Sequence, residues 1–359
     1  IKPLVLFLAF AMGTFCSCSA RERSSARERS FYVSPSGSDR NPGTRAKPLA
    51  TFEGARDAVR RLPKDAKSNG VTVWIGSGTY TLSDTLELDA RDSGAKGAPI
   101  VYRAEKGAKV SVMGGKIIPA ASFKPVTNKA ILDRLAESAR GKVLQYSLQK
   151  QGIASQTPSP VWSSRNELVE GVMFSRRSPV PELFFNNKPL PFSRWPNEGW
   201  ATYGKVIDKG SVPRWKEKPD RPGTLEYTGT RPERWTNAER IYIQGYFAYD
   251  WFDDVLTVGK LDTGSKQITF TTPHMYGLKP NKRYRAIGLL EEIDQPGEWM
   301  IDHKAGILYL YPPADMAGGE FALSMVEAPM VRMTRTRYIT FRDLTLEVTR
   351  GMAIDIAGG

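Results

Sequence analysis

Short apolar runs separated by turn residues dominate the first third of the chain. They lie at 31–33, 71–75, 78–80, 85–88, 100–103 and 110–112, and Gly, Asp or Ser bounds most of them. Runs of this length and composition are typical of β-strands. Helical segments do not alternate with them, which argues against a doubly wound α/β sheet. The pattern predicts an all-β fold.

One segment ahead of most of these strands has helical spacing. Thr51 is suited to the N-cap position and Pro63 to the end of the helix, so the pattern predicts a helix over 51–62. A second helix is expected near 130–139. The intervening polar segment 89–99 carries turn residues without a helical pattern, and we interpret it as one long loop. The apolar positions of the first helix are Ala50, Phe52, Ala55, Ala58, Val59 and Leu62.

The last part of the chain repeats itself. Similar strands begin at Met330 and Met352, which are 22 residues apart, and further strands are expected at 338–341 and 344–346. A repeat of this length is typical of a solenoid, in which each coil buries its apolar residues against the coil below. We therefore predict a right-handed parallel β-helix with three strands per coil. The helix over 51–62 would cap its open end.

Longer, hairpin-like strands occupy the middle of the chain. They are expected at 182–185, followed by an Asn186-Asn187 turn, and at 240–244, 267–271, 299–302 and 307–311. This change of pattern indicates a β-rich domain inserted into the solenoid. The predicted organisation is a cap and first coils over 31–115, an insertion domain over 116–325 and resumed coils over 326–359.

Both ends of the chain carry signals of their own. The apolar run 4–15 behind Lys2 has the length of a signal-peptide core, and 1–20 is interpreted as a cleaved signal peptide or a lipoprotein leader built on Cys16 or Cys18. A polar linker follows over 21–30. We expect an exported bacterial protein that is periplasmic, extracellular or held at the cell surface by a lipid anchor. Because 352–359 has the pattern of a strand and a turn, we expect the chain to be an N-terminal fragment.

The composition is that of a folded soluble protein, with 40% hydrophobic and 25% charged residues. The net charge of +13 would attract polyanions, but the chain has no nucleic-acid motif, and nucleic acid is not an expected partner. Since both cysteines lie in the leader, the folded part has no disulfide, catalytic thiol or zinc-thiolate site. No metal or cofactor is expected, apart from the Ca²⁺ that a polysaccharide lyase would need.

Several motifs resemble a known family. The segment 31–39 (FYVSPSGSD), with 41–44 (NPGT) and 47–51 (KPLAT), is similar to the opening of right-handed parallel β-helix proteins of the pectate-lyase-like superfamily. Others resemble glycoside hydrolase family 141 and its insertion domain, so that the resemblance covers 31–359. These are 92–94 (DSG), 100–104 (IVYRA), 190–197 (LPFSRWPN), 249–251 (YDW), 289–292 (LLEE), 296–299 (PGEW) and 306–313 (GILYLYPP).

The resemblance implies a glycosidase acting on plant-type polysaccharide, such as fucosylated or xylan-type polymers. It places the catalytic carboxylates on later coils beyond Gly359, so no catalytic residue is assigned in this chain. The expected partner is a polysaccharide or oligosaccharide, and a monomer is expected.

Glycoside hydrolysis needs two carboxyl groups that flank the scissile bond. We therefore consider an acidic, aromatic rim made by Asp250 and Trp251 together with Glu291 and Glu292. The alternative is that the aromatic residues belong to the core of the insertion domain and the acids to solvated loops. Trp195 could present an aromatic platform at a loop, although a packed hairpin end is the favoured interpretation.

Two further candidates for substrate contact lie on or beside the resumed coils. Asp355 stands between Ile354 and Ile356, so strand alternation directs it outward if the two isoleucines face the core. Arg350 precedes that strand. His274 and His303 are the only histidines, and neither has a nucleophile motif nearby. His274 follows a strand end and is interpreted as a surface or turn histidine.

Three functions remain open. The first is an exported glycoside hydrolase. The second is a polysaccharide lyase acting on an acidic glycan with Ca²⁺, which the net charge of +13 favours. The third is a non-catalytic glycan-binding or structural β-helix protein.

Overall fold

The computed structural model describes residues 29–63, 65–153, 181–313 and 315–358, together with the backbone of four two-residue strands between 164 and 177. Those strands form two small antiparallel pairs: β10 (Ser164–Arg165) with β13 (Arg176–Arg177), and β11 (Leu168–Val169) with β12 (Val172–Met173). The predicted leader lies outside the described residues. Within the described residues, the fold is all-β with two short α-helices, as the apolar pattern predicts.

The first and last parts of the described chain form three small parallel sheets. Every strand predicted there is present, and the strand predicted at 31–33 begins earlier, at Arg29, inside the predicted linker. The first sheet contains β1 (Arg29–Val33), β2 (Val71–Ile75), β5 (Ile100–Ala104) and β28 (Ile339–Arg342). The second contains β3 (Gly78–Thr81), β6 (Val110–Met113) and β29 (Thr345–Glu347). The third contains β4 (Leu86–Leu88), β27 (Val331–Thr334) and β30 (Ile354–Ala357).

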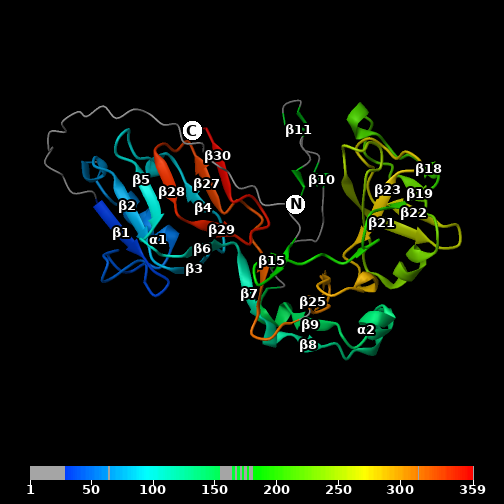
Figure 1. Ribbon diagram of the computed structural model, residues 1–359. Helices are drawn as coiled ribbons and strands as arrows, with labels where there is room; N and C mark the ends of the chain where they lie inside the picture. The colour runs from blue at the N-terminus through cyan, green and yellow to red at the C-terminus, as the bar shows by residue number, and fades with distance from the viewer. Residues whose placement is uncertain are drawn as a thin grey trace, which may run out of the picture.

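The chain visits these three sheets in turn three times (Figure 1). The strands β2, β3 and β4 make one round, and β28, β29 and β30 make the last. The middle round begins with β5 and β6, but its third strand, β27, follows only after the whole antiparallel part of the chain. In the register, Val331 pairs with Ile354, an offset of 23 residues where the sequence repeat suggested 22.

A column of aromatic rings runs through the core between the parallel sheets. Tyr102 is 1% exposed, and its ring stacks on Phe341 of the neighbouring strand (centroids 5.3 Å apart) and on Phe52 of α1 (6.4 Å). The helix α1 (Phe52–Arg60) covers this column on one side with its buried face of Phe52, Ala55, Ala58 and Val59. The same face was predicted from the helical spacing.

The start of α1 is fixed as the sequence predicts. Thr51 caps the helix by accepting a hydrogen bond from the amide of Gly54 (2.9 Å), and its hydroxyl donates to Asp39 (2.7 Å). Asp39 also accepts from the amides of Ala50 and Thr51. A Cβ on Gly54 would lie 2.1 Å from an Asp39 carboxylate oxygen, so glycine is required for this close approach.

The segment 89–99, expected to be one loop, contains a 3-10 turn at Ala90–Asp92. The turn forms because Asp89 and Asp92 make a capping box, in which each side chain accepts a hydrogen bond from the other end of the turn. Arg60 of α1 holds Asp92 with two hydrogen bonds of 2.8 and 2.7 Å. This pair ties the helix to the turn.

Antiparallel sheets occupy the chain from Gly115 to Ser324. One four-stranded sheet contains β7 (Gly115–Pro119), β14 (Leu183–Phe185), β15 (Lys188–Pro189) and β26 (Glu320–Ser324). The other contains β8 (Lys124–Pro125), β9 (Leu144–Ser147), β24 (Trp299–Asp302) and β25 (Ile307–Leu310). The predicted turn at Asn186 and Asn187 joins β14 to β15, and both residues have positive φ, as a tight hairpin turn requires.

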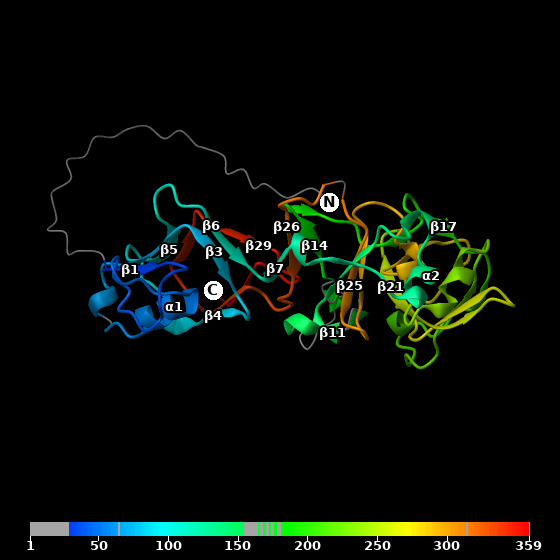
Figure 2. The ribbon, with the colours of Figure 1, turned by 90° about the horizontal axis from the view of Figure 1, so that it is seen from below.

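The largest sheet has eight strands. They are β16 (Arg194–Trp195), β17 (Ala201–Thr202), β18 (Val206–Asp208), β19 (Thr224–Glu226), β20 (Tyr242–Gly245), β21 (Asp254–Asp262), β22 (Gln267–Phe270) and β23 (Arg283–Ile287). Figures 1 and 2 agree that this sheet and the parallel sheets lie at opposite ends of the molecule, with the two four-stranded sheets between them. The second helix, α2 (Lys129–Arg134), is shorter than predicted, and a 3-10 turn at Glu137–Ala139 follows it.

Candidate functional site

A pocket of about 270 Å³ lies where the eight-stranded sheet meets the sheet of β24 and β25. Charged side chains from three places in the chain line it: Glu239 and Arg240 just before β20, Asp302 to Lys304 at the end of β24, and Arg134 at the end of α2. Leu289, Leu290 and Met300 contribute an apolar part. Two larger hollows also occur, but the described residues that line them include no Asp or Glu.

Hairpin geometry places the groups on the β24 side. Asp302 ends β24, and its Oδ1 accepts a hydrogen bond from the amide of Ala305 (2.9 Å), which is typical of an Asp that opens a tight turn. His303 and Lys304 occupy this turn. Burial, together with the nearby cations Arg240 and Arg350, lowers the pKa of His303 to about 4, although Asp302 opposes the shift. The imidazole is therefore neutral at neutral pH.

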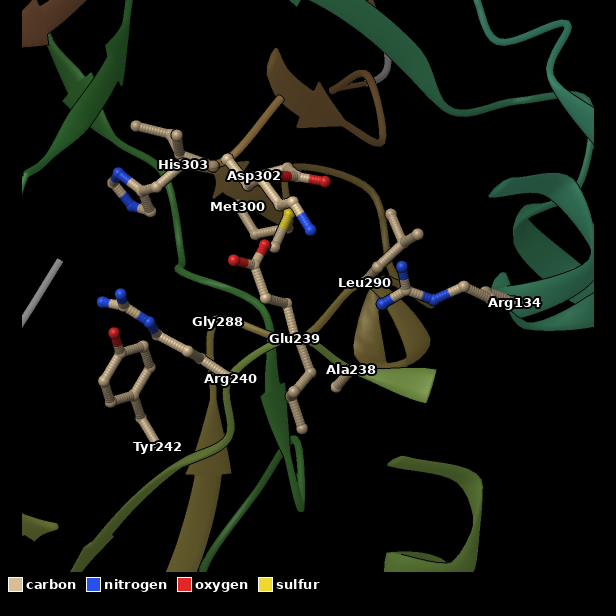
Figure 3. Close-up of a pocket in the computed structure, with 13 residues that line it drawn as sticks. Arg134, Ala238, Glu239, Arg240, Tyr242, Gly288, Leu290, Met300, Asp302 and His303 are labelled. Carbon is tan, nitrogen blue, oxygen red and sulfur yellow. The ribbon is translucent and has the colours of Figure 1, made fainter. Parts of the chain in front are cut away.

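The pocket has charges of both signs. Figure 3 shows the Glu239 side chain extending toward Met300 and Asp302, with Arg240 beside Tyr242 at one end and Arg134 at the other. Burial raises the pKa of Tyr242, and the nearby Arg240 guanidinium opposes that effect. The result is a small open site with two carboxylates as acceptors, cations as donors and an apolar wall. Such a lining suits a small ligand that has many hydroxyl groups.

Glu291 and Glu292, predicted as part of a rim, are 2% and 0% exposed. They lie in a 3-10 turn at Leu290–Glu292. Glu291 accepts from Arg134 Nε (2.7 Å), and Glu292 accepts from two nitrogens of Arg231 and from Trp235 Nε1 (2.6 Å). These contacts pair both buried charges with arginines, although Glu291 Oε2 has no hydrogen-bond partner, and they hold the turn against α2 and the 3-10 helix Arg231–Asn237. The geometry thus gives both glutamates a structural role.

A third buried acid, Glu298, lies close to this turn. It is 3% exposed, and its Oε2 accepts from the amides of Asp294 (2.8 Å) and Gln295 (3.0 Å). Burial raises the pKa of Glu298 to about 7, although those two hydrogen bonds oppose the shift. Because this pKa exceeds the ordinary value of 4.5, the group stabilises the fold fully below about pH 4.5 and loses that contribution as the pH rises through about 7.

Glu298→Gln should therefore flatten the dependence of stability on pH. Glutamine keeps an acceptor oxygen for the two amides but does not ionise. Between about pH 5 and about pH 8, we expect the free energy of unfolding of the wild type to fall relative to that of the variant by up to about 3 kcal/mol. Urea unfolding at several pH values measures the difference. Parallel pH profiles for the two proteins would contradict this assignment.

The other rim residues lie on the surface of the eight-stranded sheet. Trp251 is 68% exposed and stacks on Tyr249 (centroids 5.6 Å apart). The exposed carboxylate of Asp250 pairs with Lys282 (3.3 Å). Trp195 instead is partly buried and packs against Trp235 (5.9 Å) and Tyr284 (6.3 Å), in a strand that pairs with β23.

The residues predicted on the resumed coils have ionic partners. The side chain of Arg350 is 3% exposed and pairs with Glu327 (2.8 Å). Arg332 pairs with Glu87 (2.8 Å) and with Asp355 (3.5 Å). In the register, these three residues face one another across β4, β27 and β30, so they form a row of alternating charge on the outer side of the third parallel sheet.

Sequence reasoning missed the residues of the pocket. Glu239 and Arg240 have no motif around them, and Asp302 and His303 look like ordinary hairpin residues. The one available sequence signal for the pocket was that Glu239 with Arg240, and Asp302 with His303, lie at the ends of predicted strands. The two segments meet only because β20 pairs with β23, which leads through Gly288 to the wall of the pocket.

No helix within the described ranges has the length and apolar character needed to cross a bilayer. Among the same residues, no three His, Cys, Asp or Glu side chains are grouped as metal ligands would be.

The chain is similar in part to known proteins. No protein-family profile matches it. A stretch of 96 residues, 27% of the chain, is 35% identical to 18% of the uncharacterized protein YwoF of Bacillus subtilis (strain 168). A solved structure described as a glycoside hydrolase superposes with a TM-score of 0.63 and 18% identity over 89% of this chain and 51% of its own length.

A second solved structure, described as the complex of XylC with xylose, gives a TM-score of 0.36 at 11% identity, over 90% of this chain and 36% of its own. The chain thus spans about half the length of the solved glycoside hydrolase and a smaller part of the other proteins. At 18% identity, the similarity to the solved glycoside hydrolase structure shows the fold alone. Over most of its length, the chain has a glycoside hydrolase-like fold.

Proposed function

We propose that the chain is part of an exported, polysaccharide-active protein of the glycoside hydrolase type, and that the pocket beside Glu239 and Asp302 binds a sugar unit of its substrate. The observation that carries the proposal is this pocket, in which two carboxylates, several cations and an apolar wall converge within a glycoside hydrolase-like fold. Fold alone does not establish an activity, so the chemistry of the pocket is the more specific support.

We further propose that the three parallel sheets are coils of a right-handed parallel β-helix, interrupted by an insertion domain over 116–325 as in glycoside hydrolase family 141. Two features support this arrangement. The chain visits the sheets in a constant order, and each new strand pairs in parallel with the strand of the round before. The antiparallel strands all lie between two consecutive strands of one round.

The size and polarity of the pocket suit a single sugar unit. A volume of about 270 Å³ lies just below the usual range of small-molecule sites, about 300–1,000 Å³, and so suits one sugar unit better than a longer oligosaccharide. Carboxylates accept hydrogen bonds from sugar hydroxyls, and Arg240 and Lys304 can donate to sugar oxygens. Met300 and Leu289 offer apolar contact to the C–H face of the ring.

Glu239→Gln and Asp302→Asn test this assignment. Each replaces a charge-assisted acceptor with a neutral one, and we expect the affinity for a bound glycan to fall by about tenfold. Calorimetric titration of the whole chain with fucosylated, xylan-type and polygalacturonate oligosaccharides measures the effect. Glu320→Gln, which changes an exposed acid of β26, is the matched control and should bind like the wild type.

If both pocket variants bind glycan with wild-type affinity, the sugar binds outside this pocket and the assignment of the site is wrong. Failure of the wild type to bind any glycan of the panel would contradict the proposed function itself. Product analysis separates the chemical classes: new reducing ends indicate a hydrolase, an unsaturated product that absorbs in the ultraviolet indicates a lyase, and binding without products favours a glycan-binding protein.

A further inference from the structure

A second group of surface side chains lies on the eight-stranded sheet and is separate from the lining of the pocket. It consists of Tyr249, Trp251, Phe252 and Tyr276, and we name it the aromatic platform. Tyr249 and Trp251 are stacked with an angle of 19° between their rings, and Tyr276 meets both edge-on at 5.3 and 5.4 Å. Trp251 is the exposed member of this group and the other three rings are partly buried, so the group fixes one exposed tryptophan as a candidate interaction site.

Buried aromatic residues pack beneath the platform and support it. Phe252 packs against His274 (5.6 Å), which is fully buried and also contacts Phe247 (5.4 Å). A hydrogen bond from the amide of Phe252 to the carbonyl of Tyr249 closes the turn that carries Trp251 (3.1 Å). Because Tyr249 covers one face of the indole while Trp251 stays 68% exposed, its other face is open to a ligand.

Cations surround the platform. Lys279 Nζ lies 3.9 Å from the centre of the Tyr249 ring, and Lys282 pairs with Asp250. Arg283 lies 4.0 Å from Asp250 and 4.2 Å from the centre of the Tyr246 ring, and Arg285 lies 4.6 Å from that of Trp200. Four cations therefore lie beside the partly buried rings around the exposed Trp251, with Asp250 and Asp253 as the acids in the same cluster.

We propose that the aromatic platform is a docking site for a polysaccharide chain that carries carboxylate groups, with a sugar ring lying on the open face of Trp251 and a carboxylate near Lys279. The proposal rests on the proposed function and adds to it a second contact surface and the charge of the glycan. Flat, rigid rings offer a sugar a large contact area at little entropic cost. The excess of cations, within a chain of net charge +13, favours an anionic partner over a neutral one.

Trp251→Ala and Lys279→Gln test the platform in the whole chain, with polygalacturonate and neutral xylan oligosaccharides as probes. Trp251→Ala should weaken binding of polygalacturonate by at least about tenfold, as loss of an interface tryptophan commonly does. Lys279→Gln should weaken it by about threefold at low salt and by less at high salt. Trp215→Ala is the matched control, because Trp215 is 64% exposed and lies outside the platform, and it should bind like the wild type.

The outcomes separate the two proposals. Unchanged binding of polygalacturonate in Trp251→Ala, together with a loss in Glu239→Gln, would overturn the platform and leave the proposed function standing. Equal effects of Trp251→Ala on acidic and neutral glycans, with no effect of Lys279→Gln, would overturn the assigned charge. If the wild type binds no glycan and Trp251→Ala abolishes self-association instead, the platform is a protein interface and the docking proposal is wrong.

Discussion

Replacing Glu292 with alanine is expected to lower the free energy of unfolding by about 3–5 kcal/mol. The side chain is fully buried and accepts hydrogen bonds from Arg231 and from the Trp235 indole. Removing this side chain leaves the Arg231 guanidinium and the Trp235 indole N–H without their acceptor. It also releases the 3-10 turn Leu290–Glu292, which lies between the eight-stranded sheet and the sheet of β24. Urea unfolding followed by tryptophan fluorescence measures the loss.

Asp133→Ala is the control for this prediction. Asp133 pairs with Lys129 at 2.7 Å, but both side chains are more than half exposed, so this change should cost less than about 1 kcal/mol. If Glu292→Ala also lowered the free energy of unfolding by less than about 1 kcal/mol, the buried pair would not hold the structure together. The glutamate would then be free for the role in sugar binding that its sequence suggested.

Tyr102→Ala is expected to lower the free energy of unfolding by a similar amount, about 3–5 kcal/mol. Tyr102 is 1% exposed and lies between Phe52 of α1 and Phe341 of β28, so one substitution removes the middle ring of the column that joins the helix to the first parallel sheet. Differential scanning calorimetry and urea unfolding both report the effect.

Tyr102→Phe keeps the ring and should cost less than about 1.5 kcal/mol. A small loss in Tyr102→Ala as well would mean that α1 and the parallel strands do not share one core. A large loss in Tyr102→Phe would place the stabilisation in the hydroxyl group and not in the stacked ring.

Much of the fold could be predicted from the sequence, because local rules determine it. The helix cap at Thr51, the strands of the parallel sheets and the hairpin turn at Asn186 and Asn187 all follow from side-chain chemistry within a few residues. The spacing of Met330 and Met352 gave the offset between the paired strands β27 and β30 to within one residue. The 3-10 turn at Ala90–Asp92 was missed although its capping box of Asp89 and Asp92 is local, while its further partner Arg60 lies 32 residues from Asp92.

The candidate site was much less predictable, because its members are distant in the sequence. Glu291 and Glu292 look like exposed acids when their neighbours alone are considered, but their arginine partners are 157 and 61 residues away. Conversely, nothing near Glu239 or Asp302 distinguishes them from surface acids. Only the pairing of β20 with β23 and the β24 hairpin bring them to one pocket.

Amide hydrogen exchange of the whole chain, with and without the tightest-binding glycan, tests the central claim most directly. If the pocket binds the sugar, protection should increase in the segments 238–242, 288–290 and 300–304, and Glu239→Gln should reduce that increase. Binding that leaves these three segments unprotected would contradict the assignment of the pocket, and protection confined to the parallel strands would place the sugar on the outer face of those sheets.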